Sequence, residues 1–215
     1  MGKVSAPATR RDGRDAAAGQ GLRFPSALAV AAGGGLALGG LTQVGQSFLP
    51  SWLSSLANSG APWVLIAFGL AFFSRTAWAA AVAGAVALAG LEIGYVIVAA
   101  LRDFPSALTT VIFWLVAAVA FGPPAGLGAY FLRVRKAPWD ALGGGLLAGI
   151  VAGEGLVAFL TVRDTTSPGY WIAQLVGAVL AVLVGRRTGS AWVLGAFLVG
   201  VAALGATRFV PVLGA

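Results

Sequence analysis

Residues 139–160 read WDALGGGLLAGIVAGEGLVAFL, and this stretch decides the class of fold. It is apolar and rich in glycine, and it is long enough to cross a bilayer as a helix. Inside its apolar part it carries one carboxylate, Glu154. Residues 78–98 follow the same plan: they begin with Trp78, continue through alanine and glycine, and carry one carboxylate, Glu92. We interpret the remaining sequence as the surroundings of these two acids.

The composition indicates a membrane protein. Of the 215 residues, 59% are hydrophobic and only 10% are charged, and the mean hydropathy is +0.90. A soluble domain is about 25% charged, so this chain has too little charge to cover a water-facing surface. We therefore expect the lipid bilayer to be its main partner. The apolar runs are continuous and show no period-2 alternation, which favours spanning helices over a transmembrane barrel.

Two missing residue types narrow the chemistry. The chain has no cysteine and no histidine, which removes disulfides, thiolates and the commonest metal ligand and general base. We therefore predict no metal, no cofactor and no enzyme activity. Two glutamates could act as an acid and a base, but neither a nucleophile nor a phosphate loop accompanies them. The net charge of +7 does not indicate nucleic acid, because the basic residues lie at the ends of apolar runs.

The sequence predicts an all-α polytopic membrane helix bundle with seven transmembrane helices. They cover residues 26–49, 62–74, 76–101, 106–132, 138–160, 169–185 and 190–207. The second and the sixth are short for a hydrocarbon core of about 30 Å, so six spanning helices is the main rival count. Residues 1–25 are polar and basic and are predicted to form a disordered cytoplasmic tail, whereas residues 26–215 form a single transmembrane helical domain.

The basic residues give a topology. If the helices alternate in direction, one side receives Lys3, Arg10, Arg11, Arg14, Arg23, Arg75, Arg133, Arg135, Lys136, Arg186 and Arg187. The other side receives only Arg102, Arg163 and Arg208. The positive-inside rule then places the N-terminus in the cytoplasm and the C-terminus outside.

A helix hairpin recurs three times after the first helix. Each unit has an aromatic residue near the outer face, an inward helix, a basic turn and a tryptophan, followed by an outward helix rich in glycine and alanine. The first two outward helices carry Glu92 and Glu154, and all three units run in the same direction, which indicates a parallel repeat. The alternative is that any alternating hairpin places tryptophan at one interface and arginine at the other.

The two acids are the leading candidate functional residues. A charge inside the bilayer costs roughly 2.5–3.5 kcal/mol, so such residues usually mark the path of a solute or an ion. The alternative is that each acid ties neighbouring helices together. The topology places amide and phenol groups at a similar level in the outer half. The predicted substrate-binding residues are Glu92, Glu154, Gln43, Gln46, Asn58, Tyr95 and Gln174.

Glycine and proline predict two further features. Gly122, Pro123 and Pro124 are expected to interrupt the fourth helix and to act as a hinge or as a static kink. Glycines four positions apart, as in residues 35–39, 90–94 and 122–126, are expected to let helices of one chain approach closely.

Several short motifs carry a resemblance to a known family. They are Gly40-Leu41-Thr42-Gln43 with Gln46 and Pro50, Ala57-Asn58-Ser59 with Pro62-Trp63, Gly94-Tyr95, Trp114, Gly122-Pro123 with Gly126, and Gly153-Glu154-Gly155. Over about residues 28–190 the chain resembles an actinobacterial multi-pass membrane protein family of unknown function. The resemblance implies a bacterial cytoplasmic (inner) membrane protein and assigns no role to any residue. In architecture alone the chain is similar to substrate-binding subunits of energy-coupling vitamin transporters.

Two functions follow as expectations. The first is binding or transport of a small solute at a polar site in the outer half of the bilayer, with the two glutamates as proton or cation partners. The second is a structural or partner-binding membrane protein whose glutamates are helix ties. The sequence indicates neither the substrate nor the oligomeric state.

Overall fold

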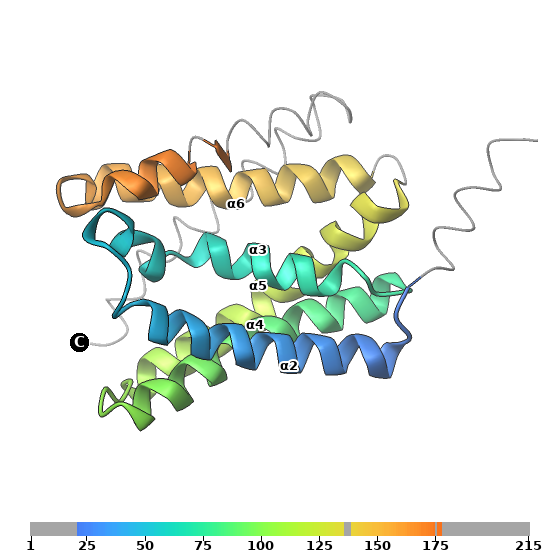
Figure 1. The fold of residues 1–215 in the computed structure, drawn as a ribbon. Helices are drawn as coiled ribbons and strands as arrows, with labels where there is room; N and C mark the ends of the chain where they lie inside the picture. The colour runs from blue at the N-terminus through green and yellow to red at the C-terminus, as the bar shows by residue number, and fades with distance from the viewer. Residues whose placement is uncertain (1–20, 136–138, 175, 178–215) are drawn as a thin grey trace, which may run out of the picture.

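The computed structural model describes residues 21–135, 139–174 and 176–177. Figure 1 shows long helices side by side, with the short helix α3 between α2 and α6. The elements are α2 (Phe24–Gly45), the 3-10 helix η1 (Ser51–Asn58), α3 (Gly60–Ala71), α4 (Ala77–Leu101), α5 (Leu108–Val134), α6 (Trp139–Thr161) and η2 (Arg163–Thr165). Residues 168–174 and 176–177 are also helical. Helix α4 contacts α2, α3 and α5, and α5 contacts α6.

Helices occur at the first five predicted positions, but some ends differ. The first helix was predicted to reach residue 49, and α2 instead ends at Gly45, after which the chain turns and enters η1. A helix begins at residue 168, where the sixth helix was predicted to begin at 169. Its later part lies outside the described residues, as does the predicted helix over 190–207. The count of seven helices and the threefold repeat therefore remain predictions.

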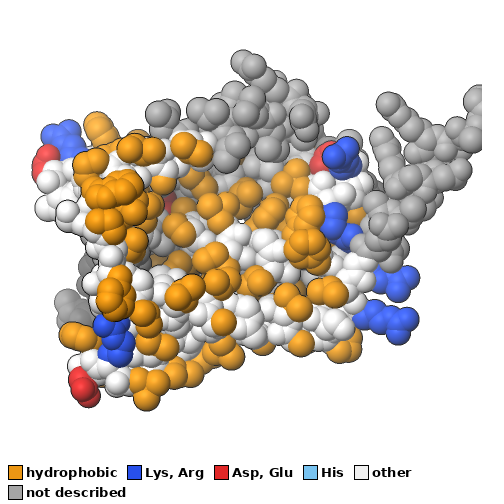
Figure 2. All heavy atoms as spheres, in the orientation of Figure 1, with side chains coloured by type: hydrophobic (Ala, Val, Ile, Leu, Met, Phe, Trp, Pro, Cys, Tyr) orange, Lys and Arg blue, Asp and Glu red, His pale blue; other side chains and the backbone are white. Residues whose placement is uncertain are grey.

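Within the described residues, four helices are long and apolar enough to cross a membrane: α2, α4, α5 and α6. Helix α3 has 12 residues, a length of about 18 Å at 1.5 Å per residue, which is less than a hydrocarbon core of about 30 Å. On the face drawn in Figure 2, the Lys and Arg side chains of the described residues lie at the two ends of the bundle, with hydrophobic side chains between them. This distribution is typical of a membrane protein.

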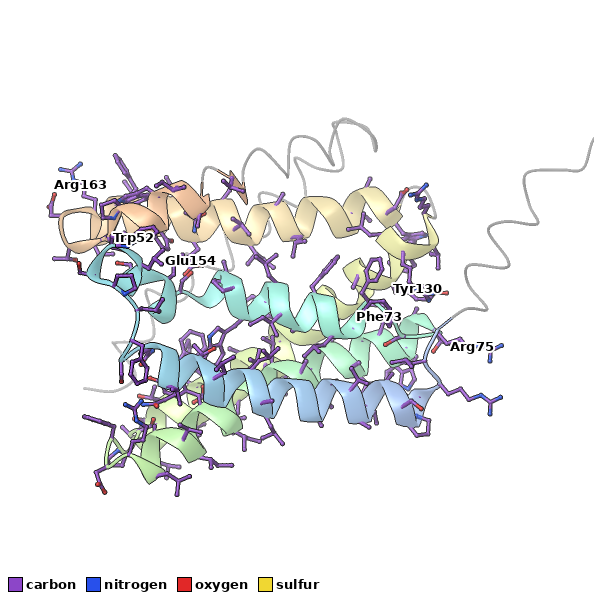
Figure 3. The ribbon with its side chains drawn as sticks, viewed as in Figure 1. Trp52, Phe73, Arg75, Tyr130, Glu154 and Arg163 are labelled. Atoms are coloured by element: carbon purple, nitrogen blue, oxygen red, sulfur yellow. The ribbon has the colours of Figure 1, made fainter. Side chains whose placement is uncertain are left out.

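Arginine side chains lie at both ends of the described bundle. At one end, the Leu22 nitrogen donates to the Phe73 oxygen at 2.7 Å, and the Arg133 side chain donates to the Ser74 oxygen at 2.6 Å. These contacts hold the basic turns together. Figure 3 shows Arg75 at this end and Arg163 at the opposite end. Which end faces the cytoplasm remains a prediction.

Glycine lets the long helices pack backbone to backbone. A Cβ atom on Gly39 or Gly94 would collide with the backbone of the facing helix, at Leu91 or Leu36. The same holds between α4 and α5, where Gly84 faces Gly122, and Gly126 faces the Ala80 carbonyl. The glycine pairs at 35–39, 90–94 and 122–126 therefore serve close packing within the chain, as predicted.

The predicted interruption at Gly122 was wrong, because α5 continues as one helix from Leu108 to Val134 with Pro123 and Pro124 inside it. The prolines still remove two N–H donors from the helix. Gly122 and Gly126, on either side of the two prolines, pack directly against the backbone of α4. A hinge role for this segment remains a prediction.

Candidate functional site

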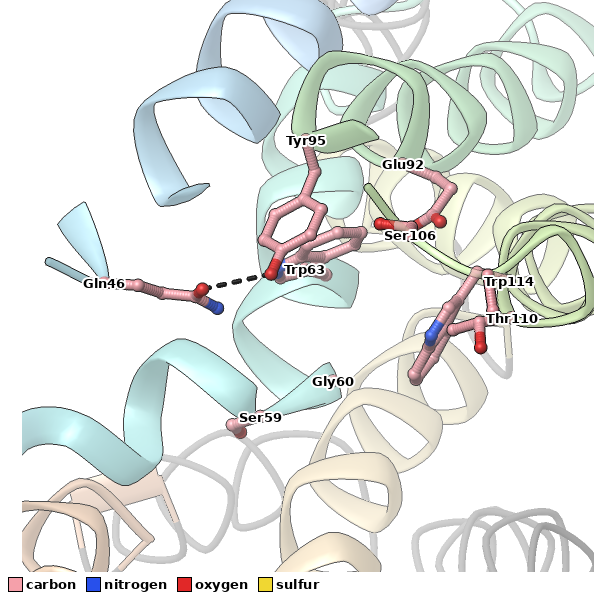
Figure 4. A pocket seen from close by; sticks show the side chains of 10 residues that line it. Gln46, Ser59, Gly60, Trp63, Glu92, Tyr95, Ser106, Thr110 and Trp114 are labelled. Atoms are coloured by element: carbon pink, nitrogen blue, oxygen red, sulfur yellow. Dashed lines mark hydrogen bonds between the residues drawn. The ribbon is translucent and has the colours of Figure 1, made fainter. Parts of the chain in front are cut away.

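A pocket of about 300 Å³ lies between α3, α4 and the start of α5, beside the end of α2 (Figure 4). Its lining combines polar, aromatic and small residues. The polar ones are Gln46, Ser59, Glu92, Ser106 and Thr110, the aromatic ones are Trp63, Tyr95 and Trp114, and the small ones are Gly60 and Ala107. The pocket lies near the C-terminal end of α4, which is the end of the bundle that carries Arg102.

Glu92 is the one acidic residue of this lining. It lies on α4 one turn before Tyr95, so both side chains share a face of the helix. The residue is only 3% exposed, and no hydrogen bond or ion pair joins its carboxylate to any residue that the structure describes. A buried carboxylate without a partner is costly, and none of the described residues offsets that cost at Glu92.

Ser59 provides a second buried polar group at the pocket. It is the N-cap residue of α3 and has an extended backbone, but its side chain makes no capping hydrogen bond. The residue is 5% exposed, and its Oγ has no hydrogen-bond partner among the described residues. Ser59 and Glu92 therefore both present unpaired polar atoms at one pocket.

The N-terminus of α3 is capped by a side chain from another helix. Glu154 on α6 accepts hydrogen bonds from the Gly60 nitrogen at 2.8 Å and from the Ala61 nitrogen at 2.6 Å, one on each carboxylate oxygen. Negative charge at a helix N-terminus is favourable, and bonds from N–H groups to a carboxylate are stronger than neutral ones. Glu154 therefore ties α6 to α3, and it does not line the pocket.

Two more polar side chains, those of Tyr170 and Gln174, lie near Glu154 and not near Glu92. Tyr170 is buried, and its hydroxyl lies near Glu154 and Gln174. The Gln174 side chain lies against the backbone of Gly155, the residue after Glu154. Gln174 thus belongs to the surroundings of the α3 cap and is separate from the pocket.

Three aromatic rings form one wall of the pocket. The ring centroids of Trp63 and Tyr95 are 5.9 Å apart, and those of Trp63 and Trp114 are 6.3 Å apart. The Tyr95 hydroxyl donates to Oε1 of Gln46 at 3.0 Å, which fixes the ring against the end of α2. In Figure 4 the Glu92 carboxylate is seen between the rings of Tyr95 and Trp114.

The remaining predicted site residues are Gln43, which does not line the pocket, and Asn58. Gln43 is buried and accepts a hydrogen bond from Arg102 at 2.9 Å on its side-chain oxygen. Asn58 is the last residue of η1, and only its backbone is described. Of the seven predicted residues, the structure thus brings Glu92, Gln46 and Tyr95 together around one pocket.

Sequence reasoning missed much of the lining. Trp63 and Trp114 were named only within the family motifs, and Ser106 and Thr110 were not singled out. One signal was available for Trp63, because it follows the polar Asn58-Ser59 turn by one helical turn. Nothing in the sequence indicates that the segment around Ser106 meets α3, because that contact joins distant parts of the chain.

The lining of the pocket contains one acidic and no basic residue. No group of three or more His, Cys, Asp or Glu residues occurs within the described ranges. The chemistry on offer is one negative charge, several hydroxyl and amide groups, and three ring faces. Such a set suits recognition of a small molecule.

Comparison with known proteins assigns the chain to a family. Neither the curated proteins nor the solved structures contain a match to the chain. One family model, described as a family of unknown function (DUF6518), matches residues 18–215. The predicted membership of a family of unknown function is thereby confirmed over more of the chain than the motifs covered. Its actinobacterial origin remains a prediction. The chain belongs to the family of unknown function DUF6518.

Proposed function

We propose that this chain is an integral membrane protein that binds a small solute in the pocket around Glu92. The observation that carries the proposal is a buried carboxylate that faces a pocket of about 300 Å³ and has no partner among the described residues. Ligand sites are commonly pockets of roughly this volume with a few convergent polar groups and aromatic walls. The four apolar helices supply the membrane anchor.

We further propose that binding serves transport across the bacterial cytoplasmic membrane. The pocket lies at the end of the bundle with few basic residues, which the positive-inside rule assigns to the outer face. A solute would enter there and meet Glu92 as a proton or cation partner, with Gln46 and Ser59 as hydrogen-bonding groups.

The second candidate is a structural or partner-binding membrane protein. It is favoured by Glu154, whose carboxylate bonds to Gly60 and Ala61 and so acts as a helix tie. Under this alternative Glu92 would also be structural, and the pocket would have no ligand.

The experiment is a solute screen on the purified full-length protein, with the melting temperature as readout. The wild type is compared with Glu92→Gln and with Asp164→Asn, which alters an exposed carboxylate. We expect at least one solute that stabilises the wild type and Asp164→Asn but not Glu92→Gln. If a broad screen of cations, anions and neutral solutes stabilises none of the three proteins, the solute-binding proposal fails and the structural alternative gains support.

A further inference from the structure

The charge of the pocket points to the charge of its ligand. Glu92 is buried, and no Lys or Arg stands among the residues that line the pocket. A carboxylate taken out of water is stabilised by an opposite charge in contact with it. Since the described chain supplies none at this place, the ligand is expected to supply a positive charge.

The residues that line the pocket favour an organic cation over a metal ion as its ligand. Calcium takes 6–8 oxygen ligands, and magnesium takes six in a rigid octahedron. The pocket has a single carboxylate, and three of its ten lining residues are the aromatic Trp63, Tyr95 and Trp114. Such ring faces attract cations with weakly hydrated organic surfaces, and clusters of them recognise ammonium groups.

The geometry of the rings suits this use. Neighbouring centroids are 5.9 Å and 6.3 Å apart and the rings are tilted by 55° and 40°, so the three faces are not stacked flat on one another. The Tyr95 hydroxyl is held by Gln46, which orients that ring beside Glu92. The unpaired hydroxyl of Ser59 offers a hydrogen bond to a polar group elsewhere on the same ligand.

We propose that the pocket binds a small organic ammonium ion, with its cationic head against Glu92 and the rings of Trp63, Tyr95 and Trp114. This inference rests on the proposed function, because it names the class of solute that the same pocket takes. The pocket volume of about 300 Å³ equals roughly ten water molecules at about 30 Å³ each. The ligand is therefore small, with a head such as an alkylated or protonated amine and a short polar tail.

An ammonium head could belong to a free solute or to a phospholipid. The test therefore begins in nanodiscs made only of phosphatidylglycerol, whose head group has no ammonium. The probes are choline, tetramethylammonium, ethanolamine and the neutral choline isostere 3,3-dimethylbutan-1-ol, titrated at constant ionic strength with tryptophan fluorescence and calorimetry as readouts. A second arm uses nanodiscs that contain phosphatidylcholine or phosphatidylethanolamine.

We expect at least one ammonium probe to bind at least about tenfold more tightly than the neutral isostere. Glu92→Gln should remove this preference, whereas Glu92→Asp should retain part of it. Trp114→Leu changes a residue of the lining that is 40% exposed, so the variant should fold normally and still weaken ammonium binding severalfold. Competition by the ammonium lipids in the second arm would identify the head group as a source of the ligand, and lack of competition would identify a free solute.

The outcomes separate this inference from the proposed function. If the neutral isostere binds as tightly as choline, or if Glu92→Gln retains the preference for the cation, the ammonium inference is overturned. The same holds if the screen finds only anions or neutral solutes, although solute binding then stands. If no solute of any class binds, both proposals fail.

Discussion

The Glu154 carboxylate on α6 accepts a hydrogen bond from the Gly60 backbone nitrogen at the start of α3, across 2.8 Å and 94 positions of sequence. Gly60 is also part of the pocket lining. One acid therefore fixes the wall of a pocket into which the other acid, Glu92, projects without a partner. The two glutamates share similar sequence surroundings and have different physical roles, and this difference yields opposite predictions for the same substitution.

Glu154→Gln should destabilise the protein. The glutamine amide can accept one of the two hydrogen bonds, while its NH₂ group would face an N–H donor. We expect the free energy of unfolding to fall by about 1–3 kcal/mol, measured by thermal or denaturant unfolding in one detergent. Asp164→Asn is the control, because that side chain is 92% exposed and its replacement should change nothing measurable. Equal effects of the two substitutions would show that the cap bonds contribute nothing.

Glu92→Gln should leave the ligand-free protein as stable as the wild type or more so. The substitution keeps the shape of the side chain and removes a buried charge that has no partner among the described residues. We expect the free energy of unfolding to stay constant or to rise by about 1 kcal/mol. The measurement is the same unfolding experiment without added solute. A loss as large as that of Glu154→Gln would instead identify Glu92 as a helix tie.

The helices could be predicted from the sequence because apolar runs, prolines and glycines are local signals. The predicted 76–101 helix and α4 (Ala77–Leu101) differ by one residue, since Thr76 caps the helix with its side chain on the Ala79 nitrogen. The 3-10 helix η1 was missed, because the run SWLSSLAN has neither the length nor the caps of an α-helix. Local patterns thus located the long elements and left out the short one that leads into the pocket wall.

The site was predictable only in part. Glu92 and Tyr95 lie one turn apart on one helix, so their shared face follows from spacing alone. Whether an acid meets a helix N-terminus or a pocket depends on the packing of α6 against α3, which no local pattern encodes. For this reason the sequence grouped Glu154 and Gln43 with Glu92, whereas the structure pairs Glu154 with Gly60 and Gln43 with Arg102.

Gly39→Ala should weaken the contact between α2 and α4. The added Cβ would collide with the Leu91 carbonyl, and backbone cannot move aside as a flexible side chain can. We expect a loss of about 1–3 kcal/mol of unfolding free energy from overpacking. Gly33→Ala on the same helix is the matched control, because its Cβ would have no neighbour within 4 Å. It should be neutral or stabilise by up to about 1 kcal/mol through helix propensity. Similar losses at both positions would argue against the close approach of α2 and α4.

Arg102→Lys should loosen the end of α2 beside the pocket. The guanidinium donates from one nitrogen to Oε1 of Gln43 at 2.9 Å and from the other to the Ser47 hydroxyl at 2.7 Å. A lysine ammonium cannot reproduce this fork. We expect faster hydrogen exchange in residues 43–50 and a loss of about 1 kcal/mol of unfolding free energy. Arg163→Lys, at an exposed side chain, is the control and should leave this exchange unchanged. Unchanged exchange in Arg102→Lys would show that the fork does not hold the end of α2.

Asp103→Gly should stabilise the protein through the backbone. Asp103 has φ 62°, in the left-handed region, and it follows the C-cap of α4. The Asp103 nitrogen donates to the Ala100 oxygen at 3.2 Å, and the Phe104 nitrogen to the Ala99 oxygen at 2.9 Å, which is the Schellman pattern that favours glycine. We expect a gain of up to about 1 kcal/mol in unfolding free energy. Asp103→Ala separates this effect from loss of the carboxylate, since alanine removes the charge but keeps the Cβ strain, and it should be neutral or destabilising. If alanine stabilised the protein as much as glycine, removal of the charge rather than relief of the left-handed backbone would be the cause.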